Sequence, residues 1–194
     1  GVLLIVDEVF TGFYRTSSRF AFEQAGIAPD LLCLSKGITG GFLPLSVTLT
    51  TEVIFEKFLS DNLSTAFLHG HSYTANPLGC AAALKSWEIL HRPAVQDQIK
   101  KITIWTKERI QRLNNFDLAT EPRSLGTIGA FDLSLENSYF SNSQSKKLAQ
   151  AAFQKWVYLR PLGPTIYTVP PYCITSNQFH KIYDVIEEAL LGLS

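Results

Sequence analysis

The sequence predicts an α/β fold, and two features of the chain point to it. The first part contains aliphatic runs that end in charged residues, VLLIVDE and DLLCLSK. Continuous apolar runs of this kind are typical of strands buried on both faces of a parallel sheet. The later part mixes strand-like segments with amphipathic helical ones, as an α+β region does. We therefore expect two domains, at 1–95 and 96–194.

The elements of the first domain follow from the local pattern. Strands are expected at 2–6, 30–36 and 44–51, with a short helical stretch at 19–25 and a glycine-rich turn at 36–41. A short amphipathic helix should cover 52–58. Asn76 and Pro77 begin a helix over 77–90, because proline is well tolerated at the first helical position. This helix is mostly apolar, so we expect it to be largely buried.

The second domain should begin with an amphipathic helix over 94–113. The pattern then predicts a strand at 127–135, a helix at 143–155, and short strands at 157–160 and 165–169 around a Pro-Leu-Gly-Pro turn. Thr175 is the expected N-cap of a closing helix that ends at residue 191. All three tryptophans lie in apolar patterns and are expected in the core: Trp87, Trp105 and Trp156.

Composition excludes several classes of protein. Of the 194 residues, 46% are hydrophobic, which excludes an intrinsically disordered chain. Lys and Arg together number 17, as do Asp and Glu, so the formal net charge is zero. This balance argues against a nucleic-acid partner bound by bulk charge and against a polybasic membrane protein.

The cysteines and the start of the chain bear on location and completeness. Cys33, Cys80 and Cys173 are scattered, without the spacing of a disulfide framework or a zinc site, so a reducing, cytoplasmic compartment is expected. The apolar run at 2–6 is too short to span a bilayer. Because the chain contains no methionine and opens inside this run, we expect it to be a piece of a longer protein.

Asp7 and Lys36 are the first candidate site residues. Each ends a predicted parallel strand, and ligands of open α/β sheets bind beyond the carboxyl ends of the strands. A lysine that binds a carbonyl carbon and an acid that binds a pyridinium nitrogen are the pair that pyridoxal phosphate requires. A structural ion pair between the same two residues is the alternative. Glu8 should point to the opposite face of the strand, where a structural role is expected.

Three segments resemble the motifs of class III pyridoxal-phosphate-dependent aminotransferases: VDEVFTGFYRT, DLLCLSKGITGG and NPLGCAAA. The order and spacing of these motifs also match the family. HGHSYTANPLGCAAA and RPLGPTIYTVPPYCI are most similar to the biotin-pathway branch of that class. The resemblance covers the carboxyl-terminal half of such enzymes. It implies fold type I of the pyridoxal-phosphate-dependent transferases, with part of the cofactor-binding large domain at 1–95 and the small domain at 96–194.

The resemblance implies roles for particular residues. Asp7 would hold the pyridine nitrogen of pyridoxal 5'-phosphate, and Lys36 would form the internal aldimine and move the proton. A second group would meet the cofactor phosphate of the partner subunit in a homodimer: Gly70, His71 and Ser72. Arg160 would bind the substrate carboxylate, and Tyr167 would line the substrate pocket. Arg15 matches a family arginine near the active site whose role the sequence does not give.

The biotin-pathway branch implies S-adenosylmethionine as amino donor and 8-amino-7-oxononanoate as acceptor. Phe10 and Tyr14 replace smaller residues usual in the family, which leaves open another class III ω-amino acid aminotransferase. His71 stands where bacterial members of the branch usually have proline. A chain that is inactive on its own is a further alternative, because the family's main phosphate-binding loop lies in the other half. His69 and His71 lack further ligands nearby in sequence, so we expect no metal site there.

Overall fold

A computed structural model describes residues 1–134 and 143–193 of the chain. Those residues fall into two compact units, Gly1–Gln96 and Asp97–Ser194. The cofactor-binding role expected for 1–95 and the small-domain role expected for 96–194 stay predictions. No helix in the described residues is both long and apolar enough to cross a membrane.

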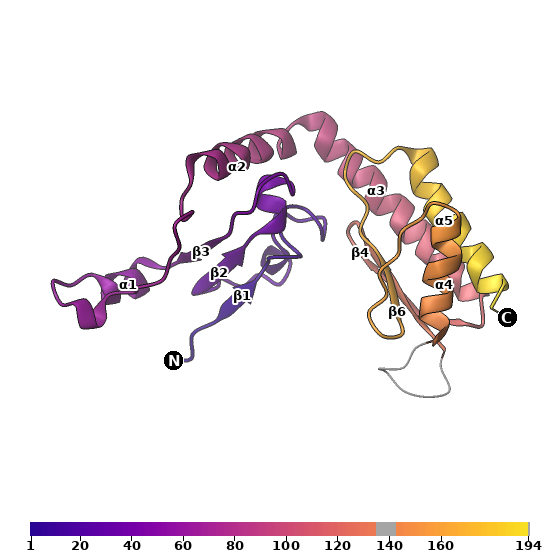
Figure 1. Cartoon of the computed structure of the whole chain (residues 1–194), viewed down its shortest axis with the longest axis horizontal. Coiled ribbons are helices and arrows are strands. Elements are labelled where there is room, and N and C mark those ends of the chain that lie inside the picture. The colour runs from indigo at the N-terminus through magenta and orange to yellow at the C-terminus, as the bar shows by residue number, and fades with distance from the viewer. Residues whose placement is uncertain (135–142, 194) are drawn as a thin grey trace. The chain divides into compact units, whose positions relative to one another are not determined.

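A three-stranded mixed sheet forms the centre of the first unit, with the strand order β1-β2-β3 (Figure 1). Strand β1 (Ile5–Asp7) runs parallel to β2 (Leu31–Leu34), and β3 (Val47–Thr50) runs antiparallel to β2. The three expected strands are thus confirmed, with shorter bounds. The expected burial of the first strand is wrong, because among the described residues β1 pairs only with β2, and Ile5 is 63% exposed.

Helices of the first unit match the predicted ranges 19–25, 52–58 and 77–90, whereas one 3₁₀ helix takes the place of the predicted glycine-rich turn and another, at 63–65, was not predicted. They are the 3₁₀ helices η1 (Ala21–Glu23), η2 (Lys36–Thr39), η3 (Glu56–Phe58) and η4 (Leu63–Thr65), and the α-helices α1 (Glu52–Phe55) and α2 (Pro77–Leu90). Helix α2 starts as expected, with Asn76 Oδ1 accepting a hydrogen bond of 2.7 Å from the Gly79 amide.

The predicted burial of α2 is wrong. Leu78 and Leu84 are 72% and 73% exposed, and only Gly79 and Leu90 of this helix are buried. The apolar composition predicted burial, but α2 makes its main packing contact with η2 and leaves its other faces open. Cys80 of this helix and Cys33 of β2 are likewise only half-buried.

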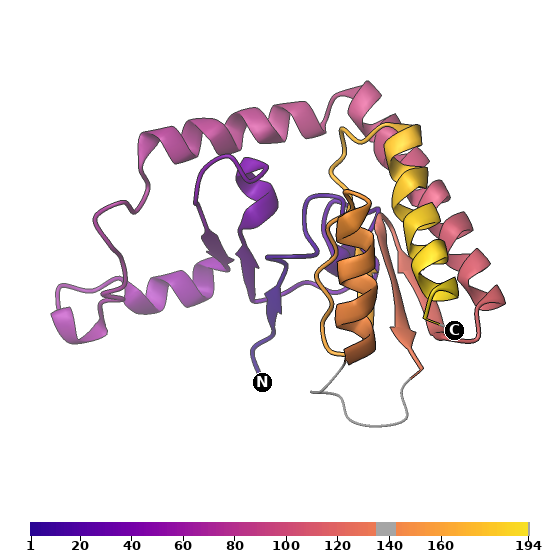
Figure 2. The same ribbon diagram turned by 45° about the vertical axis from the view of Figure 1, so that its right-hand side comes forward.

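A three-stranded antiparallel sheet and three long helices build the second unit. The sheet order is β4-β5-β6, with strands β4 (Ala119–Leu125), β5 (Ile128–Leu133) and β6 (Thr165–Thr168). The helices are α3 (Pro93–Arg112), followed by η5 (Leu113–Asn115), α4 (Ser143–Gln154) and α5 (Ser176–Leu191). Figures 1 and 2 both show α4 and α5 next to each other.

The second unit has a continuous core on one face of its sheet. Burial alternates along β5, so Phe131 and Leu133 are buried against the helices while Asp132 lies on the other face. Ile166 of β6 and Phe179 of α5 join the same core. The helix predicted at 175 begins with Thr175 as N-cap, and Gln178 completes a capping box.

The structure corrects two expectations near residue 157 and adds one strand. Residues 157–160 form no strand, and β4 was not anticipated. Trp156, expected in the core, is 90% exposed. It occupies the C′ position after α4, with φ +65°, where glycine is usual. The last residue of the strand predicted at 127–135 lies outside the described residues.

Candidate active site

Lys36 is the central residue of the candidate site in the first unit. It follows β2 directly and opens η2, with its side chain exposed and its Nζ 5.3 Å from the centre of the Phe10 ring. Its backbone has φ +43°, a conformation that residues other than glycine rarely adopt. Within the described residues its amine makes no hydrogen bond or ion pair. A strained, unpaired lysine at a strand end favours a functional role.

Asp7 ends β1, the parallel neighbour of β2, and is paired in register with Cys33. Its Oδ1 accepts a hydrogen bond of 2.9 Å from the Val9 amide, while Oδ2 accepts none from the described residues. The same part of the chain shows no ion pair between Asp7 and Lys36, which argues against the structural ion pair. The structure thus puts a free carboxylate oxygen and a free amine beyond the carboxyl ends of adjacent parallel strands.

Glu8 faces away from Asp7 and is 1% exposed, as the strand alternation predicted. Its Oε2 accepts a hydrogen bond of 2.5 Å from Thr11 Oγ1, and its Oε1 accepts one of 2.8 Å from the Phe22 amide. The carboxylate therefore ties the segment after β1 to η1. These contacts confirm a structural role for Glu8. Arg15, another candidate from the sequence, lies half-buried in the same segment.

Gly37 is in close contact with the segment after β1. A Cβ added at Gly37 would lie 2.7 Å from Cδ2 and 3.0 Å from Cβ of Phe13. Ser86 of α2 donates a hydrogen bond of 3.3 Å to the Gly37 carbonyl oxygen. Sequence reasoning missed Phe13 and Ser86, because both contacts join residues far apart along the chain.

The loop before α2 carries the expected phosphate-binding residues Gly70, His71 and Ser72, all exposed. The His71 amide donates to Thr74 Oγ1 at 2.9 Å, and His71 Nδ1 accepts from the Tyr73 amide at 3.1 Å. Within the described residues, the amides of Gly70 and Ser72 and the Ser72 hydroxyl make no hydrogen bond. A phosphate accepts hydrogen bonds from free amides and hydroxyls of this kind.

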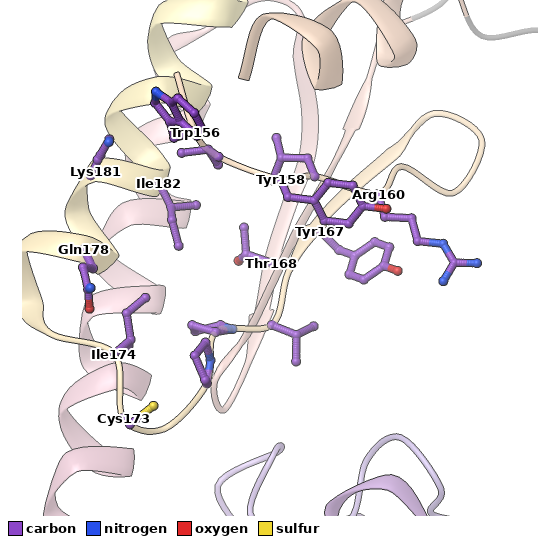
Figure 3. Close-up of a pocket in the computed structure, with 15 residues that line it drawn as sticks. Trp156, Tyr158, Arg160, Tyr167, Thr168, Cys173, Ile174, Gln178, Lys181 and Ile182 are labelled. Carbon is purple, nitrogen blue, oxygen red and sulfur yellow. The ribbon is translucent and has the colours of Figure 1, made fainter. Parts of the chain in front are cut away.

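Arg160 and Tyr167 belong to the second unit and line a pocket of about 690 Å³. Figure 3 shows both side chains at one end of this pocket and Trp156 and Lys181 at the other. Arg160 is exposed and, in the part of the chain that the structure describes, makes no hydrogen bond or ion pair. A free guanidinium at a pocket with aromatic walls is suited to binding a carboxylate.

A strongly shifted pKa is found in the core of the second unit. Burial is the main reason that the pKa of Tyr183, in the core of the second unit, is raised to about 12. The described residues contain no group of three or more His, Cys, Asp or Glu side chains that could hold a metal ion.

Comparison with known proteins assigns the chain to a family. The sequence model described as aminotransferase class-III matches residues 1–190. The chain belongs to the class III aminotransferases.

Curated class III relatives are similar over nearly the whole chain. The adenosylmethionine-8-amino-7-oxononanoate aminotransferase of Synechococcus elongatus is 46% identical over 191 residues, which cover 98% of this chain and 44% of the relative. The enzyme of the same name from Aquifex aeolicus is 35% identical over 98% of this chain and 44% of its own length. The chain therefore spans less than half the length of these relatives.

Solved structures share the fold. The adenosylmethionine-8-amino-7-oxononanoate aminotransferase of Methanocaldococcus jannaschii superposes with a TM-score of 0.90 at 33% identity, over 98% of this chain and 46% of that one. An amine transaminase from an uncultivated Pseudomonas species, solved in its PLP-bound form, superposes with a TM-score of 0.89 at 31% identity. The match covers 100% of this chain and 45% of that one. These matches confirm the α/β fold of class III transaminases.

Proposed function

We propose that the protein carrying this chain transfers an amino group from S-adenosylmethionine to 8-amino-7-oxononanoate, a step of biotin biosynthesis, with pyridoxal 5'-phosphate as cofactor. One observation carries the proposal. A free amine and a free carboxylate oxygen, on Lys36 and Asp7, follow adjacent parallel strands in a class III chain. The names of the relatives from Synechococcus and Aquifex support the substrates.

Pyridoxal phosphate, when bound, supplies an aldehyde carbon that amines attack and a ring that takes up electron density. The Lys36 amine would hold the cofactor at that carbon. Once a substrate amine has replaced it there, the freed amine would act as general base and acid, taking a proton from the substrate and returning it. Asp7 Oδ2, which accepts no hydrogen bond from the part of the chain that the structure describes, would accept one from the protonated ring nitrogen. A carboxylate there favours the cationic ring that withdraws electrons.

The remaining site residues bind anions. The amides of Gly70 and Ser72, the Ser72 hydroxyl and the His71 ring would bind the cofactor phosphate of a second subunit, so the active protein is a homodimer in this proposal. Arg160 would bind the substrate carboxylate, with Tyr167 as a wall of the pocket. A cytoplasmic location belongs to the same proposal. Light scattering that finds a stable and active monomer would exclude the shared site.

Borohydride trapping tests the central claim. The longest protein that carries this chain is mixed with pyridoxal phosphate, reduced, digested and mapped by mass spectrometry. A pyridoxyl group confined to Lys36, and lost in Lys36→Ala, is the expected result. Label spread over surface lysines such as Lys107 would refute the assignment of Lys36. The same experiment on the 194-residue chain alone decides whether this part binds the cofactor unaided.

A second candidate differs only in substrate. The Phe10 ring lies 5.3 Å from Lys36 Nζ, so its bulk stands beside the reacting amine and can narrow the space for a large donor. This favours a smaller ω-amino acid as the alternative. Turnover measured with a panel of amine donors separates the two, because S-adenosylmethionine should be the best donor under the first proposal and a poor one under the second.

A further inference from the structure

The segment after β1 has an unusual backbone beside the candidate site. Phe13, Tyr14 and Ser17 all have positive φ, of +60°, +71° and +76°. Bulky residues rarely adopt this left-handed conformation, because their Cβ atom comes too close to the backbone. Contacts elsewhere in the fold must therefore hold the segment in place.

A hydrogen bond from the end of α2 holds Tyr14. The hydroxyl of Tyr14 lies 3.1 Å from His91 Nε2, and the two rings meet edge to face with 5.9 Å between their centres. His91 Nδ1 lies 2.8 Å from the Trp87 carbonyl oxygen, which is only an acceptor. Nδ1 of the neutral ring therefore carries the hydrogen, Nε2 has the lone pair, and the Tyr14 hydroxyl donates to it.

Phe13, the neighbour of Tyr14 in sequence, connects the Tyr14–His91 contact with the backbone next to Lys36. Phe13 is 5% exposed, and its ring packs against Phe20 and Trp87 at centroid distances of 5.6 and 6.5 Å. On its other side it lies so close to Gly37 that a Cβ there would come within 2.7 Å. Gly37 follows Lys36 directly, so the position of Phe13 limits where the backbone of Lys36 can lie.

We propose that Tyr14 and His91 are positioning residues for Lys36. Their hydrogen bond offsets the strain of Tyr14, keeps Phe13 against Gly37, and so holds the lysine in its left-handed conformation. The chain of contacts is His91 to Tyr14, Phe13, Gly37 and Lys36. The inference rests on the proposed role of Lys36 as the residue that binds the cofactor, and it concerns contacts of this chain alone.

Two rates measured on the longest protein that carries the chain test the proposal. The first is the rate at which pyridoxal phosphate and borohydride label Lys36. The second is the rate at which acetic anhydride labels Lys36 in protein without cofactor, relative to Lys107 on α3. Tyr14→Phe and His91→Leu should each change both rates by about two- to tenfold, the range for one neutral hydrogen bond. His91→Gln keeps an acceptor near Nε2 and should lie closer to wild type.

A double substitution separates positioning from simple stabilisation. Glycine adopts positive φ without strain, so Tyr14→Gly removes the need for the hydrogen bond. His91→Leu should therefore slow labelling when residue 14 is tyrosine and have little effect in the Tyr14→Gly background. His180→Gln, a histidine of the second unit, is the matched control and should leave both rates unchanged. Circular dichroism verifies that each variant is folded.

The outcomes are distinguishable. Wild-type rates in folded Tyr14→Phe and His91→Leu would overturn the positioning role and leave the proposed function standing. An equal effect of His91→Leu in both backgrounds would also overturn it. If pyridoxal phosphate does not label Lys36 in the wild type, the proposed function fails, and the acetylation rates alone decide the positioning role. If Tyr14→Phe unfolds, the effect of His91→Leu with tyrosine at residue 14, compared with its effect in the Tyr14→Gly background, decides it.

Discussion

Gly37→Ala is the substitution that most directly challenges the geometry around Lys36. The added Cβ would lie 2.7 Å from Cδ2 and 3.0 Å from both Cβ and Cγ of Phe13. Carbon atoms in ordinary contact are about 3.5–4.0 Å apart, so the two groups must separate by roughly 0.8 Å or more. Rotation of the ring does not relieve this overlap, because Cβ of Phe13 is itself one of the close atoms.

The expected cost follows from how firmly Phe13 is held. The ring is 5% exposed and packs against Phe20 and Trp87, so the backbone of the segment or of η2 must move instead. Overpacking of this kind costs about 1–3 kcal/mol of unfolding free energy. A displacement near 1 Å at a reacting group can cost about a hundredfold in rate. We expect Lys36 to be labelled at least about tenfold more slowly by pyridoxal phosphate and borohydride.

The assay combines the labelling rate of Lys36 with thermal unfolding of the same protein. Gly192→Ala is the matched control, because its added Cβ would meet only ordinary contacts at 3.6 and 3.7 Å. This substitution should leave the labelling rate of Lys36 unchanged. A Gly37→Ala protein with the wild-type labelling rate and melting temperature would show that Phe13 does not constrain Lys36, and would refute the reasoning.

Three further predictions concern the second unit. Gly129→Ala should lower the unfolding free energy by about 1–3 kcal/mol, because its Cβ would lie 2.5 Å from the Tyr183 hydroxyl oxygen; urea unfolding that matches wild type would contradict it. Trp156→Gly should raise the unfolding free energy by about 1 kcal/mol by relieving the strain of φ +65°, and calorimetry should show a higher melting temperature, not a lower one. Asp132→Asn should cost about 1 kcal/mol at neutral pH. Burial raises the pKa of Asp132, but hydrogen bonds from Arg123 and Thr165 outweigh it and lower the pKa below 3.8. The wild-type advantage is therefore complete above that value and is lost as pH falls through the lower folded-state pKa; a difference that persists in strong acid would argue against the ion pair.

Local signals in the sequence predicted the starts of elements well. Asn76 and Thr175 cap α2 and α5 through side-chain hydrogen bonds to nearby amides, which depend on residues only three positions away. The placement of Asp7 and Lys36 also follows from local pattern, because each ends an apolar run and parallel strands share one carboxyl edge. Such features are short-range, so one sequence is enough to predict them.

Burial and backbone strain were not predictable in the same way. The apolar composition of α2 indicated a buried helix, but burial depends on which surfaces pack against it, and Leu84 is exposed. The pattern around Trp156 indicated a core residue. Its backbone instead completes the turn after α4, where the Val157 amide donates to Ala152 and the Trp156 amide donates to Phe153. These two hydrogen bonds place the indole outside the core.

The left-handed backbone of Lys36 shows that the candidate site depends on packing contacts as well as on its reactive groups. A lysine and an aspartate at strand ends supply the amine and the carboxylate, and the sequence alone predicts both. The lysine adopts φ +43° in a fold whose next residue is a glycine pressed against a buried ring. Strain at one residue is sustained only where neighbouring contacts fix its conformation. The packing of Phe13 on Gly37 is such a contact, so the segment after β1 limits where the backbone of Lys36 can lie.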